Sequence, residues 1–249
     1  LALALVTILS LSGAALSVFP AVERITAPQV ETGLTVATLA DRIQAVYPGV
    51  EQIRRSPSGR ITAYWFDQGA PGAAVIDPAT GAGVASADPN QALRWLTNLH
   101  RSLFLGDGGR IAMAAGAAAM LVLSLSGAVL VARRAGGWGH WFAPLRGPLA
   151  GRLHVEIARI AVVSLVLSSL TALWMTASTF DLLPDGGAIP AMPTEVSGET
   201  GFPLDQMATL LQTPVAELRE LSFPYPGDAT DVFTLKTDRG TGYLDQGTG

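Results

Sequence analysis

The sequence predicts a membrane α-helical protein that carries two small α+β domains outside the membrane. Two apolar segments, residues 111–132 and 160–178, contain no charged side chain, and each has about the 20 residues that a helix needs to cross a bilayer. The loop between them, residues 133–153, has four arginines and no acid. Because loops rich in Arg and Lys stay on the cytoplasmic side, we interpret this stretch as a membrane hairpin whose turn faces the cytoplasm.

The composition agrees with a membrane protein. The chain of 249 residues is 49% hydrophobic and 14% charged, whereas a soluble domain usually has about 25% charged residues. Its last segment, residues 179–249, carries eleven acids against three basic residues, which argues against nucleic-acid binding. The chain has no cysteine, so disulfides, iron–sulfur clusters and thiolate zinc sites are excluded.

Residues 1–19 form a third apolar segment. Signal peptides also have apolar N-terminal cores, but these cores are usually shorter, so we interpret the segment as a transmembrane helix. It leaves the membrane on the outer side, because the hairpin turn two crossings later is inside. The chain starts without Met and ends on Gly247-Thr248-Gly249, so we expect it to be a piece of a longer protein.

The first soluble segment, residues 20–110, has the pattern of a small α+β domain. Apolar side chains recur at three- and four-residue spacing over residues 36–46, which predicts a helix with one buried face. Apolar side chains alternate with others over residues 61–66, and this predicts a strand. A further short strand is expected over residues 74–77.

The second soluble segment, residues 179–249, follows the same scheme. A linker rich in Pro and Gly, residues 184–203, precedes a helical pattern over residues 204–211. Strands are expected over residues 232–235 and 243–245.

Similar segments show that the chain contains an internal repeat. Residues 75–81 match residues 243–249, and the apolar motif of residues 9–14 recurs at residues 123–128. Such repeats should be sought before a fold is assigned. The order is helix, soluble domain, helix, and then again helix and soluble domain. We therefore expect a four-helix transmembrane core with three helices in this chain and the fourth after residue 249.

His154 begins the last of these helices, which we place over residues 154–178. On a helix it shares a face with Ala158, Ala161, Leu165 and Ser168. Two alanines beside a histidine leave room for a flat cofactor, and polar side chains in membrane helices usually face the protein interior. Imidazole is a common ligand of haem iron, so His154 is a candidate haem ligand. The alternative is a histidine that simply sits in the lipid headgroup region.

The other two histidines differ in their position relative to the membrane. His100 precedes the first arm of the hairpin and is expected at its outer edge, whereas His154 is expected at the cytoplasmic edge. Roughly 30 Å of hydrocarbon separates the two edges, so one haem cannot bridge them, and the two histidines would bind different irons. His140 lies in the basic loop beside Trp138 and Trp141, and we interpret it as a headgroup contact.

Other polar residues have simpler interpretations. Glu156 and Arg159 stand three residues apart and predict a local ion pair. The small residues of the run 114–119 favour close helix packing. The sequence contains no nucleotide-binding loop, catalytic triad or zinc motif.

The chain resembles the PepSY-associated transmembrane family of bacterial inner-membrane proteins. The resemblance is carried by residues 99–106, by residues 152–156, by the Leu-Ser-Gly helix motifs and by the two Asp-x-x-Thr-Gly strand ends at Asp77 and Asp245. The stretch from Gly136 to Met175 most resembles members that are fused to, or work with, a flavin reductase module.

The resemblance implies two periplasmic PepSY-like domains, over residues 20–110 and 179–249. Similar proteins include periplasmic ferric-siderophore reductases that hold two b-type haems between four helices. The resemblance also implies that electrons pass from cytoplasmic reduced flavin or NAD(P)H, through two haems b, to a ferric chelate outside. His100 and His154 are then axial ligands of the haem irons, and the family's first-helix histidine is expected before Leu1.

Two other functions are compatible with the sequence. PepSY domains in other contexts resemble inhibitory or peptide-binding modules, in which case the soluble segments would bind a periplasmic peptide or protease. A transporter built on repeats is a third possibility. It is disfavoured because no acid or base lies at the middle of a membrane helix.

Overall fold

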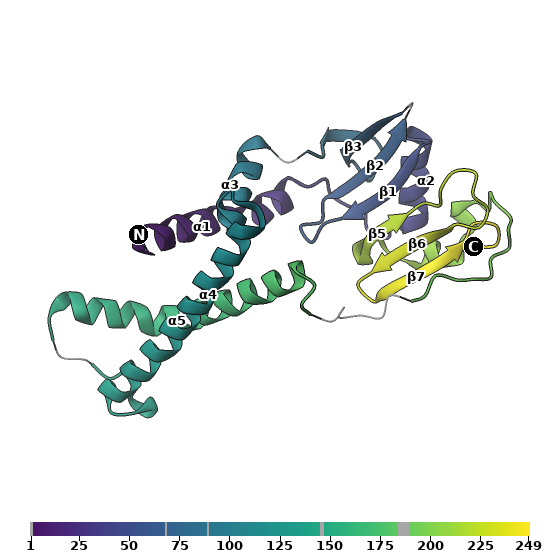
Figure 1. Ribbon diagram of the computed structural model, residues 1–249. Coiled ribbons are helices and arrows are strands. Elements are labelled where there is room, and N and C mark those ends of the chain that lie inside the picture. Colours follow the sequence, from purple (N-terminus) through teal and green to yellow (C-terminus); the bar gives the residue numbers. More distant parts are fainter. Residues whose placement is uncertain (1, 68, 89, 145–146, 184–189) are drawn as a thin grey trace. The chain divides into compact units, whose positions relative to one another are not determined.

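The computed structural model describes residues 2–67, 69–88, 90–144, 147–183 and 190–249. The chain forms two compact units, one of residues 1–94 with 188–249 and the other of residues 95–187. The first unit contains a β-sheet with short helices and one long N-terminal helix, and the second is dominated by a pair of long helices (Figure 1).

Among the described residues, three helices are long and apolar enough to cross a membrane. They are α1 (Ala2–Thr26), α4 (Gly106–Ala135) and α5 (Leu149–Thr179). The predicted membrane segments are therefore confirmed as helices, but each helix is longer than its apolar run. The apolar run of each helix matches the thickness of the hydrocarbon core. Polar residues at the helix ends extend the helix beyond that run.

The N-terminal helix extends beyond the predicted segment of residues 1–19. α1 continues through Pro20 to Thr26. Its last turns are held by the sheet of the same unit, because Glu23 accepts a hydrogen bond from Ser58 Oγ (3.0 Å) and pairs with Arg60 (3.0 Å). These contacts offset the intrahelical hydrogen bond that a proline removes.

In the described part of the chain the sheet has seven strands, and every neighbouring pair is antiparallel. Its order in space is β4-β3-β2-β1-β5-β6-β7. The strands are β1 (Val50–Arg55), β2 (Ile61–Asp67), β3 (Ala70–Ile76), β4 (Gly83–Ser86), β5 (Leu218–Ser222), β6 (Val232–Thr237) and β7 (Gly240–Asp245).

The two soluble segments meet where β1 pairs with β5. Ile53 lies opposite Leu221, and both side chains are fully buried. The sequence predicts two separate small domains, whereas the structure joins their strands into one sheet. The physical reason is that β1 and β5 would each be an unpaired edge in a separate domain, and pairing them satisfies both edges.

The hydrophobic core is also shared by the two segments. α2 (Val36–Val46), predicted from its spacing, packs against the 3-10 turn η2 (Leu204–Gln206) and the short helix α6 (Ala208–Gln212). The backbone N–H of Val36 donates to Thr213 O (2.9 Å). Fully buried core side chains come from both segments, among them Leu39, Ile43, Ile53, Ile61, Met207, Leu210, Leu218 and Leu221.

The matching ends of the repeat form turns of the same kind. The N–H groups two residues after Asp77 and Asp245 donate to the aspartate carboxylates, at 3.1 and 2.8 Å. In both turns a threonine hydroxyl donates to the same carboxylate. Each turn ends at a glycine with a left-handed backbone, Gly81 (φ 75°) and Gly249 (φ 72°). The repeat seen in the sequence is therefore a repeat of structure at these turns.

The connection that enters the second half follows the edge strand β7. Tyr243 Oη donates to the carbonyl of Pro190 (2.9 Å), and Ser197 donates to Asp245 through its hydroxyl (2.6 Å) and its N–H (2.7 Å). These hydrogen bonds from Ser197 hold the pKa of Asp245 well below its usual value. The described part of the predicted linker thus covers an edge that would otherwise expose unpaired backbone groups.

The junction between the halves gives a test of the single sheet. Gln52 and Ser222 are opposite residues of β1 and β5, and their side chains are in contact at 3.4 Å. Cβ atoms of such pairs lie about 4.5–5.5 Å apart, close to disulfide geometry. We expect Gln52→Cys with Ser222→Cys to form an intramolecular disulfide on mild oxidation, seen as faster migration on non-reducing gels.

The matched control is Gln52→Cys with Lys236→Cys, because β6 is separated from β1 by β5. Two strand spacings, about 9–10 Å, are too far for a disulfide. The chain has no native cysteine to interfere. Equal crosslinking of the two pairs, or none in the first, would contradict the β1–β5 pairing.

Candidate cofactor pocket

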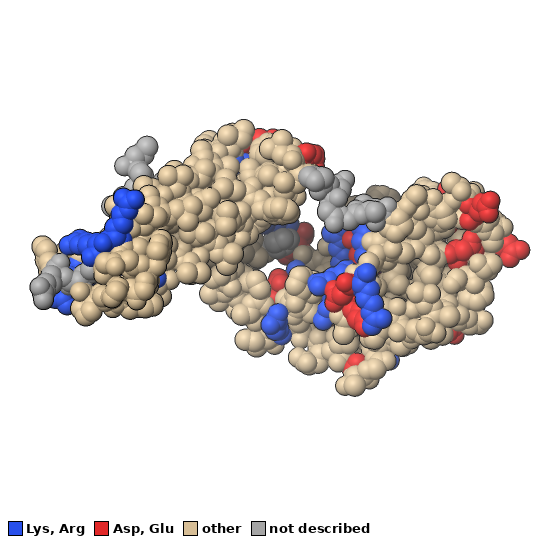
Figure 2. Space-filling view, turned by 90° about the horizontal axis from the view of Figure 1, so that it is seen from below, with Lys and Arg blue, Asp and Glu red and all other residues tan. Residues whose placement is uncertain are grey.

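The second unit is built on a crossed pair of helices. α4 and α5 cross each other in contact (Figure 1), and Ser124 and Ser169 are buried. Most other side chains of the two apolar runs are exposed, as expected for surfaces that face lipid. Figure 2 shows this surface as largely uncharged, with basic side chains, all of them arginine, gathered at the loop end of the hairpin.

Glycine ends the first arm and sets the direction of the loop. Gly136 has a left-handed backbone (φ 93°), and its N–H donates back to carbonyls of the last turn of α4, as in a common helix C-cap. The 3-10 turn η1 (Trp138–His140) follows. Trp138 and Trp141 stack with ring centroids 5.6 Å apart. The loop therefore folds into a compact turn as soon as α4 ends.

Arg159 fastens this loop to the second arm. Its side chain is only 1% exposed; Nη1 donates to Glu156 (2.8 Å) and Nη2 to the carbonyl of Ala143 (2.8 Å). The predicted local ion pair with Glu156 is confirmed. The sequence gives no sign of the second contact, which holds the segment after Trp141 against α5.

A pocket of about 530 Å³ lies between the arms at this end of the hairpin, within the size range of small-molecule sites. One wall comes from α4, including Met120, Ser124 and Arg134, and the other from α5, including His154 and Leu165. Trp141 of the loop closes the end. The lining residues recur at helical spacing on each arm, so the pocket runs along the facing sides of both helices.

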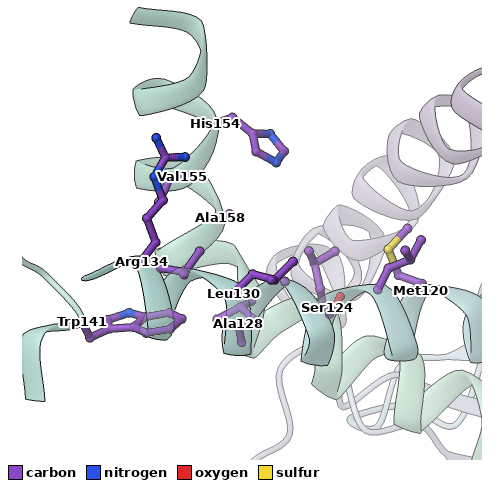
Figure 3. A pocket seen from close by; sticks show the side chains of 14 residues that line it. Met120, Ser124, Ala128, Leu130, Arg134, Trp141, His154, Val155 and Ala158 are labelled. Atoms are coloured by element: carbon purple, nitrogen blue, oxygen red, sulfur yellow. The ribbon is translucent and has the colours of Figure 1, made fainter. Parts of the chain in front are cut away.

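The lining has an apolar length and a polar end. Small side chains, Gly127, Ala128 and Ala158, widen the space between the arms. Arg134 and His154 lie at the end nearest the loop, and in Figure 3 the His154 ring projects over the wall formed by Leu130 and Ser124. The buried Ser124 hydroxyl has no hydrogen-bond partner in the described part of the chain. Such a group is usually paired, so it can accept or donate a bond to a bound molecule.

His154 is placed as its helical spacing predicts. It stands in α5 with an exposed ring, and Ala158 and Leu165 of its predicted face also line the pocket. Ala161 is outside the lining, and Ser168 is exposed while its neighbour Ser169 is buried. Successive residues of a helix point about 100° apart, so a small error in the orientation of the predicted face is enough to select Ser168 in place of Ser169.

His100 and His140 lie outside the pocket lining. His100 is half-buried near the end of α3 (Gln91–Ser102), before α4 begins, whereas His154 follows the other end of α4. Because α4 is 30 residues long, about 45 Å of helix separates its two ends. His140 is exposed in η1. Within the described residues no group of three or more His, Cys, Asp or Glu could hold a metal ion.

Sequence reasoning does not identify Arg134, Trp141 and Ser124 as residues of one site. Each has a local explanation: a topology signal, a headgroup anchor and a packing residue. A signal does exist, because Ser124, Gly127, Val131 and Arg134 recur at three- and four-residue spacing on α4 and all line the pocket. This spacing indicates a site only once the structure shows that α5 packs against the same face of α4.

Comparison with protein families agrees with the membrane helices of this chain. A family model described as the PepSY-associated TM region matches residues 1–231. The chain belongs to the PepSY-associated transmembrane family. Members are membrane proteins, and the three candidate spans make this PepSY-associated chain a multi-pass membrane protein. A search of curated proteins found no match.

Proposed function

We propose that this chain is the membrane part of a haem-binding oxidoreductase of the bacterial inner membrane. It passes electrons from cytoplasmic reduced flavin or NAD(P)H to a periplasmic acceptor, a ferric siderophore or similar chelate. The observation that carries the proposal is the position of His154 at the polar end of an apolar pocket between two membrane helices. His154 and His100 bind different haem irons, and a flavin reductase module, attached or separate, supplies the electrons.

The residues of the pocket fit a haem. Its walls are mostly apolar, and small side chains at Gly127, Ala128 and Ala158 leave space for a flat ring between the arms. His154 can present a neutral ring nitrogen to iron. A bound haem with two histidine ligands supplies one-electron transfer, because no coordination position stays open for other chemistry. The second ligand of each iron comes from another helix, for His154 from a histidine upstream of Leu1.

The chain's own residues fix the loop at this end of the pocket. The bonds from Arg159 to Glu156 and Ala143 hold the loop against α5, and Trp141 of that loop forms one end of the pocket.

The edge strand β4 favours a second candidate function, the binding of a periplasmic peptide or protease. All residues of β4 are exposed, and it stands at the end of the sheet. An exposed edge can pair with an extended peptide by adding a strand. In that case purified full-length protein has no Soret band, and the histidines are incidental.

The haem ligands are tested by substitution in the full-length protein. We expect His154→Ala and His100→Ala each to remove about half of the bound haem, because each histidine serves one of two irons. The measurement is the Soret absorbance per protein after purification in detergent. His140→Ala is the control and should leave the spectrum unchanged. Full haem content in either of the first two variants would exclude that histidine as a ligand.

The pocket itself is tested with two alanines of α5. Ala158 lines the pocket and Ala161 does not, so Ala158→Leu adds volume inside the proposed site and Ala161→Leu adds it elsewhere. We expect Ala158→Leu to lower haem content or shift the Soret band, because an added isobutyl group occupies the space of the ring. Equal effects of the two substitutions would indicate general helix packing rather than a cofactor site.

Topology is tested by cysteine labelling in spheroplasts. The loop with its arginines is cytoplasmic, and the sheet is periplasmic. We expect cysteine at Ser197, which is exposed, to react with an impermeant maleimide from outside. Cysteine at Gly147 should react only after the membrane is opened. Labelling of Gly147→Cys in intact spheroplasts would reverse the proposed direction of electron flow.

A further inference from the structure

Arg134 is the cationic residue that lines the pocket. It stands in the last turn of α4 and reaches toward the start of α5, where a Cβ on Gly147 would lie 3.4 Å from its Nη2. Figure 3 shows its side chain beside Val155, at the same end of the pocket as His154. Arg133, its neighbour in sequence, is not part of the lining, because adjacent helical residues point about 100° apart.

The apolar walls create a need for such a charge. Haem carries two carboxylates on one edge of an otherwise apolar ring. A carboxylate that enters an apolar pocket without a partner is strongly disfavoured. Arginine is suited to this role, since its planar guanidinium can bind a carboxylate through two hydrogen bonds. Arg159, another arginine at this end of the hairpin, donates to Glu156 and Ala143 and is not part of the pocket lining.

We propose that Arg134 binds the carboxylate edge of the cofactor in this pocket and so fixes its orientation. The inference rests on the proposed function and adds a specificity-determining residue to it. Arg134 stands at the loop end of the α4 wall, and Ser124 and Met120 lie farther from the loop, so a carboxylate held by Arg134 would be at the loop end. The positive charge stabilises the reduced cofactor, which carries one more negative charge than the oxidised form, so Arg134 raises the midpoint potential.

The test compares Arg134→Gln with Arg133→Gln in the full-length protein, since both remove one charge from the same turn of α4. We expect Arg134→Gln to weaken haem binding by about tenfold or more, the range for a charged hydrogen bond, and to lower the midpoint potential in a redox titration. Arg134→Lys should recover part of both losses. Arg133→Gln should resemble the unchanged protein.

Haem dimethyl ester, in which both carboxylates are blocked, separates a direct contact from a folding defect. We expect the unchanged protein to bind the ester more weakly than haem. The difference in affinity between the unchanged protein and the Arg134→Gln variant should vanish for the ester, because a contact that is already lost cannot be lost twice.

The outcomes distinguish the two proposals. Haem binding and potential that are the same in Arg134→Gln and Arg133→Gln would overturn the role of Arg134 and leave the haem site standing. A loss in Arg134→Gln that persists undiminished with the ester would also overturn it. A full-length protein without any Soret band would overturn the proposed function and this inference together.

Discussion

The antiparallel pairing of β1 with β5 joins residues that lie as far as 170 positions apart in the chain. Everything between them, including the helical hairpin, must leave the sheet and return to it. A sheet whose strands lie in water cannot be divided by a bilayer, since unpaired strand edges are not tolerated in hydrocarbon. The hairpin must therefore cross the membrane an even number of times. α4 and α5 satisfy this requirement, because two crossings return the chain to the side from which it left.

Because the chain must turn back between α4 and α5, a few polar contacts in the loop are enough to shape one end of the pocket. α4 and α5 are joined by a short loop and contact each other where they cross, and the pocket lies between them near the loop. Gly136 lets the chain turn directly after α4, and Arg159 secures the loop to α5 through Ala143. A buried guanidinium is costly unless its hydrogen bonds are made, so the loop and the arginine depend on each other. The closed end of the pocket follows from this contact.

The sequence predicts those parts of the fold that depend on local patterns. The spacing over residues 36–46 gives α2 and the alternation over 61–66 gives β2, because periodicity reflects a buried face within one element. The pairing of β1 with β5 is different. The sequence of neither strand shows which strand it pairs with. One large sheet forms in place of two small ones because pairing β1 with β5 removes two unpaired edges, and these edges meet only when the chain folds.

The pocket shows the same division between local and distant information. The helical spacing from His154 identifies Ala158 and Leu165 correctly because they share one element. Arg159 looks like the partner of Glu156 alone, since the sequence cannot show that Ala143 folds back beside it. Arg134 is understood at first only as a topology signal. Its place in the lining requires the crossing of two helices that no single-helix pattern encodes.

Arg133 and Arg134 illustrate how one run of charge can serve two purposes. Both lie in the last turn of α4, and both contribute to the basic end of the hairpin. Topology depends on how many positive charges a loop carries and not on where each side chain points. A cofactor carboxylate depends on direction, which differs by about 100° between the two positions. The basic loop end of the hairpin therefore supplies cations near the polar end of the pocket, and the helix phase decides which of them line it.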